Sequence, residues 1–255
     1  MKSKLYVVGI GPGDSRYLTG EAAQALEEAE LIVGYNIYVN ILCEQKSYPG
    51  KEFYSTGMGD EVDRCRYAVE QAEKGRTVAV ICSGDAGVYG MASLVLSLAE
   101  KHNTVDITIV PGITAALSGA ALLGAPIGND FAVISLSTAL TPWERIEKRL
   151  EGAAGADLAI VLYNPMSRHR PDTLSRACAI ISEHTGDNRV AGYVRNIGRS
   201  GEEHSLTTVG ELKNAKLDMF TTVFIGSSDT NVINGKMITG RKYEVEQDTG
   251  ICRDE

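Results

Sequence analysis

The fold is decided by the stretch Leu5-Tyr6-Val7-Val8-Gly9-Ile10-Gly11-Pro12-Gly13-Asp14, in which an apolar strand pattern runs directly into a glycine-rich turn. Glycines at the carboxyl end of a strand permit a tight turn and let a ligand approach the backbone. The turn does not match the dinucleotide-binding pattern G-x-G-x-x-G, which requires glycine at Asp14 and an acidic residue near Val33-Gly34. A nucleotide-like ligand and a purely structural turn both remain open at this point.

Two further turns follow strand patterns in the same half of the chain. One is Ser83-Gly84-Asp85-Ala86-Gly87-Val88-Tyr89-Gly90, and the other is Val110-Pro111-Gly112-Ile113-Thr114-Ala115-Ala116. Ligands in open α/β sheets bind outside the carboxyl ends of the strands, so three such turns predict a pocket. Asp85 is expected either to bind hydroxyls or an amino group of a ligand, or to cap the helix that follows.

The first half alternates short β-branched runs with helical patterns, which predicts a parallel sheet with helices on its faces. The predicted strands are Leu5–Val8, Leu31–Val33, Glu52–Tyr54, Thr77–Cys82 and Ile107–Val110. The predicted helices are Thr19–Glu28, Glu61–Lys74 with Asp60 as N-cap, Met91–Lys101 and Ile113–Leu123. The last helix consists mostly of small residues that allow close backbone approach, and we expect it at a domain junction.

A second α/β series follows Pro126. Its predicted strands are Phe131–Leu136, Leu158–Tyr163, Val190–Val194, His204–Thr208 and Thr221–Ile225. Its predicted helices are one that opens with Thr141 as N-cap and Pro142 at the first helical position, then Asp172–Glu183 before a terminating Gly186, and Gly210–Asn214. The chain is therefore predicted to be an α/β protein with an N-terminal parallel sheet over 1–115, a C-terminal mixed sheet over 116–245 and a polar tail over 246–255.

Composition limits the class of protein. The five cysteines of the 255 residues are scattered, odd in number and without a CxxC pair, which argues against a disulfide framework and a structural zinc site. A net charge of −8 argues against a nucleic-acid surface, which needs clustered basic side chains. No apolar run approaches the roughly 20 residues that span a bilayer. We expect a cytoplasmic protein without a nucleic-acid partner, a membrane contact or a protein-bound metal.

The three turns together resemble those of the tetrapyrrole methylases, in that order and at the usual separations. Within that family, Leu162-Tyr163-Asn164-Pro165-Met166-Ser167-Arg168 and Val194-Arg195-Asn196-Ile197-Gly198-Arg199 resemble segments of the C17-methyltransferases. The resemblance covers Leu5 to Tyr243. Ser83 and Ala86 depart from the family pattern, which often has Gly and Pro there, but backbone contacts should survive these changes.

The resemblance implies an S-adenosylmethionine-dependent C17-methyltransferase of cobalamin (corrin) biosynthesis, with associated ring contraction. Its substrate would be cobalt-factor III or precorrin-3B, which the sequence does not distinguish. The methyl donor is expected in a cleft between the two domains, and the chain as a homodimer. The alternatives are another tetrapyrrole methylase of the same pathway and a donor-binding homologue without turnover. The implied donor-binding residues are Pro12, Gly84, Asp85, Val88, Thr114, Ala115, Asn164, Arg195 and Thr222.

Four arginines of the second half could bind the acidic macrocycle. Arg168, Arg170, Arg195 and Arg199 follow two predicted strands. A tetrapyrrole carries many carboxylates, and arginine binds a carboxylate through paired hydrogen bonds. The alternative is four solvated surface arginines. The substrate-binding candidates are Gly11, Asp14, Tyr35, Arg168, Arg170 and Arg199.

Tyr35 and Tyr38 are expected in a loop after a strand, either packed against the macrocycle or half-buried as structure. No nucleophile–base pair stands at a suggestive spacing, and methyl transfer by in-line displacement depends mainly on positioning. The catalytic residues are therefore unknown. Ring contraction could use a proton donor or acceptor, for which the weak candidates are His169, His204 and Glu144.

Overall fold

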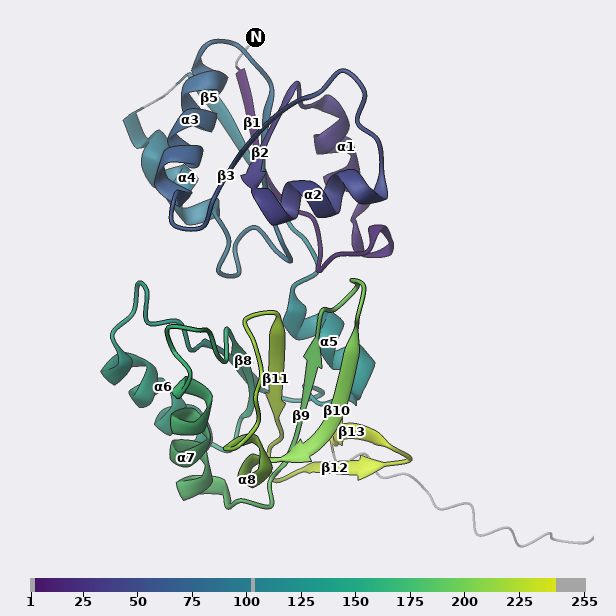
Figure 1. Ribbon diagram of the computed structural model, residues 1–255, viewed down its shortest axis with the longest axis vertical. Coiled ribbons are helices and arrows are strands. Elements are labelled where there is room, and N and C mark those ends of the chain that lie inside the picture. The colour runs from purple at the N-terminus through teal and green to yellow at the C-terminus, as the bar shows by residue number, and fades with distance from the viewer. Residues whose placement is uncertain (1–2, 102–103, 242–255) are drawn as a thin grey trace, which may run out of the picture. The chain divides into compact units, whose positions relative to one another are not determined.

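The computed structural model describes residues 3–101 and 104–241, which form two compact α/β units (Figure 1). Unit 1 consists of Met1–Leu122, Val194–His204 and Phe220–Thr222. Unit 2 consists of Leu123–Tyr193, Ser205–Met219 and Val223–Glu255. The predicted domain ranges, 1–115 and 116–245, stay predictions, and the predicted tail over 246–255 lies outside the described residues.

Unit 1 contains a five-stranded sheet in the order β3-β2-β4-β1-β5. All of its neighbouring strands run parallel, as predicted; in the register, Val7 lies between Val80 and Ile109. β4 is buried along its whole length, which is why its sequence is a continuous apolar run. The strands are β1 (Ser3–Gly9), β2 (Leu31–Tyr35), β3 (Glu52–Thr56), β4 (Val78–Cys82) and β5 (Val105–Val110).

Helices cover both faces of this sheet. Alternate residues of each strand point to opposite faces, so Val7 packs with α3 and α4, whereas Val8 packs with α1 and α2. The helices on these faces are α1 (Gly20–Glu28), α2 (Asn36–Gln45), α3 (Glu61–Glu73) and α4 (Ala92–Leu98), with 3-10 turns η1 (Ser15–Tyr17) and η2 (Ala99–Lys101). Helix α5 (Ala115–Leu123) follows the turn after β5.

Helix α2 corrects one expectation. Tyr35 and Tyr38 were expected in a loop, but Tyr35 ends β2 and Tyr38 lies within α2. The helix begins without a side-chain cap and has a weakly periodic, partly β-branched sequence, so it carries little local signal. Burial of Val39 and Leu42 in the core beside the sheet stabilises it instead.

A second five-stranded sheet has the order β10-β9-β11-β8-β7. β8 pairs parallel with β7 and antiparallel with β11, which confirms the predicted mixed sheet. The strands are β7 (Phe131–Ser135), β8 (Ala159–Tyr163), β9 (Val190–Arg195), β10 (Glu203–Thr208) and β11 (Thr221–Ile225). The helices are α6 (Trp143–Gly155), α7 (Thr173–Thr185) and α8 (Val209–Leu212). Helices α6 and α7 bury Ile146, Leu150 and Ile181 against Leu162 of β8 in the core of unit 2.

The start of α6 differs in detail from the prediction. Pro142, in extended backbone, is the N-cap, and no side chain caps the helix, so Thr141 does not have the expected role. The end of α7 is as expected, because Gly186 adopts a φ of 77° at the C-cap. No helix in the described ranges is long and apolar enough to cross a membrane.

A small third sheet, in the order β12-β13-β6, was not predicted. It contains β6 (Gly124–Ala125), β12 (Thr230–Ile233) and β13 (Lys236–Thr239). Asn234 and Gly235 join β12 to β13 with φ values of 50° and 70°. An Asn-Gly pair with positive φ at both positions is the signature of a tight hairpin, so the sequence did carry this signal.

Candidate functional site

The turns after β1 and β4 are joined directly by backbone hydrogen bonds. The N–H of Gly11 donates to the carbonyl of Gly84 at 3.0 Å, and the N–H of Gly84 donates to the carbonyl of Gly11 at 2.7 Å. The N–H of Ile10 donates to the carbonyl of Cys82 at 2.9 Å. Because β1 lies between β4 and β5 in the sheet, all three glycine-rich turns meet at one edge.

The glycines are required by close backbone approach. A Cβ on Gly112 would lie 2.2 Å from the carbonyl oxygen of Gly84 and 2.6 Å from that of Gly9. A Cβ on Gly9 would lie 2.7 Å from the same Gly84 oxygen. The atoms that such a Cβ would meet belong to the backbone, so they could move only if a whole turn moved. The predicted convergence of the turns is therefore present within unit 1.

Asp85 links the turn after β4 to the turn after β5. Its Oδ1 accepts hydrogen bonds from the N–H groups of Gly87 and Val88 at 2.7 and 2.9 Å, and its Oδ2 accepts from the N–H of Gly112 at 2.9 Å. Burial acts to raise the pKa of this carboxyl, but the backbone N–H groups outweigh burial and the pKa lies below its usual value. Met91 is the N-cap of α4, so Asp85 does not cap that helix.

Apolar side chains are exposed around these turns. Val88 is 37% exposed, and Leu117 on the first turns of α5 is 52% exposed. Thr114 and Ala115 are half-buried where α5 begins. Tyr89, with a φ of 55°, is 52% exposed beside Val88. A ligand with a flat apolar face could cover such side chains.

Arg199, from the segment between β9 and β10, contacts the first two turns. Its Nε donates to the carbonyl oxygen of Pro12 at 2.7 Å, and its Nη2 donates to the hydroxyl of Ser83 at 2.9 Å. Burial lowers the pKa of the guanidinium, which lies over the ring of Phe220 at 6.0 Å. None of the carboxylates in the described part of the chain forms an ion pair with Arg199. Sequence reasoning selected Arg199 but missed both Ser83 and Phe220 as its partners.

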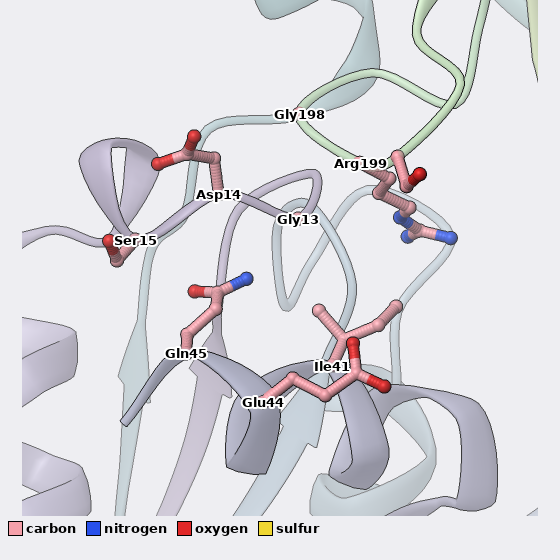
Figure 2. A pocket seen from close by; sticks show the side chains of 9 residues that line it. Gly13, Asp14, Ser15, Ile41, Glu44, Gln45, Gly198 and Arg199 are labelled. Atoms are coloured by element: carbon pink, nitrogen blue, oxygen red, sulfur yellow. The ribbon is translucent and has the colours of Figure 1, made fainter.

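A pocket of about 310 Å³ lies beside Arg199 (Figure 2). Sequence reasoning found Asp14 and Arg199 but missed the contribution of α2, because the helix itself was not predicted. In Figure 2, Glu44 and Gln45 of α2 lie across the pocket from the turn that carries Gly13. The lining residues are Gly13, Asp14, Ser15, Ile41, Glu44, Gln45, Gly198, Arg199 and Ser200.

Three of the substrate-binding candidates in unit 1 already contact other residues of the protein. The carboxylate of Asp14 accepts hydrogen bonds from the side chain and the backbone N–H of Arg16, which lower its pKa. Gly11 forms the bridge to Gly84. Tyr35 packs edge-on against Tyr38, with ring centroids 5.2 Å apart. The roles of these residues toward a substrate stay predictions.

The remaining ligand candidates are distributed over both units. In unit 1, Arg195 pairs with Glu203 at 3.4 Å, and Thr222 is buried in β11. In unit 2, Asn164, with a φ of 54°, donates to the hydroxyl of Ser135 at 3.0 Å.

The predicted cluster of four arginines is also divided. Arg170 and the exposed Arg168 belong to unit 2, whereas Arg195 and Arg199 belong to unit 1. Arg170 donates from Nη1 to the carbonyl of Leu136 at 3.0 Å. Convergence of the four side chains stays a prediction.

The three candidates for proton transfer are exposed. His169 lies in the turn closed by Ser167 and Arg170, His204 lies on β10, and Glu144 lies in the first turn of α6. Their roles stay predictions. In the described ranges, no cluster of three or more His, Cys, Asp or Glu side chains could hold a metal ion.

The sequence matches the family Tetrapyrrole (Corrin/Porphyrin) Methylases over residues 4–213, so the chain belongs to this family. The family prediction, the α/β fold and the assignment as a methyltransferase are thereby confirmed.

Individual relatives agree with the more detailed resemblance. The chain is 45% identical over 241 residues to the probable cobalt-factor III C(17)-methyltransferase of Salmonella typhimurium, covering 94% of this chain and 99% of the relative. It is 37% identical over 237 residues to the precorrin-3B C(17)-methyltransferase of Sinorhizobium sp, covering 91% and 92% of the two chains. The crystal structure of the methyltransferase CobJ superposes with a TM-score of 0.86 at 37% identity, covering 93% of this chain and 100% of that one.

Proposed function

We propose that this protein is an S-adenosylmethionine-dependent C17-methyltransferase of corrin biosynthesis that acts on cobalt-factor III or precorrin-3B. The observation that carries the proposal is the set of three glycine turns joined by the Gly11–Gly84 bridge and the Asp85–Gly112 hydrogen bond. These turns coincide with the segments by which the chain resembles its family. The relatives named C(17)-methyltransferase supply the substrate class.

The donor fits the chemistry of these turns. S-adenosylmethionine combines a flat aromatic base, a ribose and an amino acid, which need one apolar surface and several backbone hydrogen-bonding groups. Exposed Val88 suits the base, and glycine backbones let the polar parts approach. Because the Asp85 carboxylate already accepts three backbone N–H groups, we propose that it shapes the turn. The proposed donor-binding residues in unit 1 are Pro12, Gly84, Asp85, Val88, Thr114, Ala115, Arg195 and Thr222.

The reaction is an in-line displacement. An electron-rich ring carbon bonds to the methyl carbon while the methyl–sulfur bond breaks, and its electron pair returns to sulfur. S-adenosylhomocysteine leaves, and the positive charge passes from sulfur to the macrocycle, which then loses it as a proton. Such a step depends on alignment, so the chain needs to fix two reactants without supplying a nucleophile.

The acidic macrocycle requires local positive charge in a protein of net charge −8. Arg168 and Arg170 of unit 2 are the proposed sources of that charge. We propose that any cobalt enters with the substrate, and that the protein is a cytoplasmic homodimer without a nucleic-acid or membrane partner.

The test is an anaerobic incubation of the purified protein with methyl-labelled S-adenosylmethionine and cobalt-factor III, with precorrin-3B in parallel. Mass spectrometry is expected to show one labelled methyl group on at least one of the two macrocycles, and reactions without enzyme give the background. Label on the cobalt compound alone assigns the cobalt-containing substrate. Label on neither, with donor binding intact, would contradict the proposal and favour another methylase of the pathway or a donor-binding protein without turnover.

A further inference from the structure

The guanidinium of Arg199 spans the bridge between the first two glycine turns. Pro12, which accepts the Nε hydrogen bond, directly follows Gly11, and Ser83, which accepts the Nη2 hydrogen bond, directly precedes Gly84. Gly11 and Gly84 pair in the bridge, and the residue next to each of them accepts a hydrogen bond from Arg199. A single side chain therefore fixes the separation of the two turns from outside the bridge.

The segment that carries Arg199 packs closely on the first turn. A Cβ on Gly13 would lie 2.5 Å from Cγ of Arg199 and 2.8 Å from the carbonyl oxygen of Gly198. Gly198 has a φ of 66°, and a Cβ there would lie 2.9 Å from the backbone nitrogen of Asp14. Glycines on both sides of this contact let the two backbones approach, which brings the guanidinium within reach of Pro12.

The same segment is held by its own hydrogen bonds. The N–H of Gly198 donates to Oε2 of Glu202 at 2.7 Å, and the N–H of Arg199 donates to the carbonyl of Asn196 at 2.9 Å. The N–H of Glu202 donates to the carbonyl of Arg199 at 3.1 Å. The backbone of Arg199 is therefore fixed before any ligand binds.

The N–H groups of Arg199 that form hydrogen bonds point toward other residues of the protein. Two of its three guanidinium nitrogens are used by neutral acceptors of unit 1, and charge-assisted bonds to such acceptors are stronger than neutral ones. The side chain is half-buried, so its hydrogen bonds cost more to lose than those of a solvated arginine. An arginine that bound a substrate carboxylate would instead present both of its terminal nitrogens to the pocket.

We propose that Arg199 is a positioning residue that fixes the turns after β1 and β4 through Pro12 and Ser83, and thereby sets the affinity for the methyl donor. This role differs from the substrate-carboxylate ligand that the sequence predicts. The inference rests on the proposed function, because it takes these two turns as part of the donor site.

The test measures binding of S-adenosylhomocysteine, the demethylated donor, by calorimetry in the absence of tetrapyrrole. Arg199→Ala is expected to weaken binding by about tenfold or more, and Ser83→Ala, which removes one acceptor, by about threefold to tenfold. Ser83→Thr keeps the hydroxyl and should restore most of the affinity. Arg66→Ala is the matched control, since Arg66 is 53% exposed on α3 and pairs with Asp63, and its affinity should equal that of the wild type.

Steady-state methyl transfer supplies a second readout. In Arg199→Ala and Ser83→Ala, KM for S-adenosylmethionine should rise in proportion to the dissociation constant, whereas KM for the tetrapyrrole at saturating donor should stay within about twofold. An Arg199→Ala protein with wild-type donor affinity and a raised tetrapyrrole KM would overturn the inference and identify a carboxylate ligand. If Arg199→Ala does not fold, wild-type affinity in Ser83→Ala overturns it. Failure of the wild type to bind S-adenosylhomocysteine would instead overturn the proposed function.

Discussion

Oδ2 of Asp85 accepts a hydrogen bond at 2.9 Å from the backbone N–H of Gly112, a residue 27 positions further along the chain. β4 and β5, the strands that end before these residues, lie on either side of β1. The bond therefore joins the turn after β4 to the turn after β5, across the carboxyl end of β1. The Asp85 carboxylate therefore stabilises the conformation of the two turns through hydrogen bonds to their backbone.

Replacing Asp85 by Asn is expected to destabilise the protein by about 1–2 kcal/mol, because an amide NH₂ cannot accept the bond from Gly112. Donor affinity should fall with it, by about tenfold. Urea unfolding and calorimetry measure the two effects. Asp63→Asn is the control, because Asp63 is exposed on α3, and it should change stability by less than about 0.5 kcal/mol. Equal stabilities of the two variants would show that the Asp85 bonds are unimportant.

The stabilising effect of Asp85 should depend on pH in a defined direction. Its pKa in the folded protein lies below the ordinary value of 3.8, so its contribution is complete above that value and is lost as the pH falls through the folded pKa. The difference in unfolding free energy between wild type and Asp85→Asn should be constant from about pH 7 to about pH 5 and shrink below pH 3.8. Urea unfolding across this range tests the sign, and a difference that grows with acidity would refute it.

Gly112→Ala is expected to disrupt the site, because the new Cβ would lie 2.2 Å from the carbonyl oxygen of Gly84. We expect a loss of at least about 2 kcal/mol of stability and loss of donor binding. Gly152→Ala is the matched control: a Cβ there meets nothing within 4 Å on helix α6, and alanine should stabilise the helix by about 0.5–1 kcal/mol. Thermal unfolding of the two variants should therefore shift in opposite directions.

Arg64 and Arg66 lie on the same helix and should differ sharply. Arg64 is only 5% exposed and donates to the hydroxyl of Thr56, the carbonyl of Gly57 and Oε1 of Glu61. Arg64→Ala should cost about 2–3 kcal/mol, since three acceptors lose their partner. Arg66→Ala should cost less than about 0.5 kcal/mol. Chemical unfolding compares them, and similar losses would contradict this assignment of burial.

Cysteine accessibility tests the packing of both units. Cys43 is exposed, whereas Cys65, Cys82 and Cys178 are buried, and burial raises the pKa of Cys65 to about 11 and those of Cys82 and Cys178 to about 12. Since the thiolate is the reactive form, iodoacetamide should label Cys43 in the folded protein, and should label Cys65, Cys82 and Cys178 only after unfolding. Peptide mass spectrometry identifies the labelled residues. Rapid native labelling of Cys178 would show that the core of unit 2 opens readily.

Strong local patterns made much of the fold predictable. Thr221–Ile225 was predicted with the bounds that the structure shows, because a wholly buried strand is a continuous apolar and β-branched run. Helix α2 was missed because its stability comes from packing of residues such as Leu42 and its sequence has little helical character. The Asn234-Gly235 hairpin was missed although its turn residues are diagnostic.

The position of the site could be predicted from the sequence, but the hydrogen bonds within it could not. Glycines after three strands of a parallel sheet indicated where a ligand approaches, since topology brings those strand ends together. The partners of Asp85 and Arg199 depend on distances between turns that no local pattern encodes. Arg199 and Pro12 are 187 residues apart, and only the folded chain shows that they are bonded.

The long sequence separations impose an order on biosynthesis. The Gly11–Gly84 bridge can form once the first third of the chain has left the ribosome, but the bonds of Arg199 require more than three quarters of it. Chains that stop short of residue 199 can build the glycine turns and still lack the guanidinium that joins them. The finished arrangement of the turns and Arg199 is therefore a late product of translation.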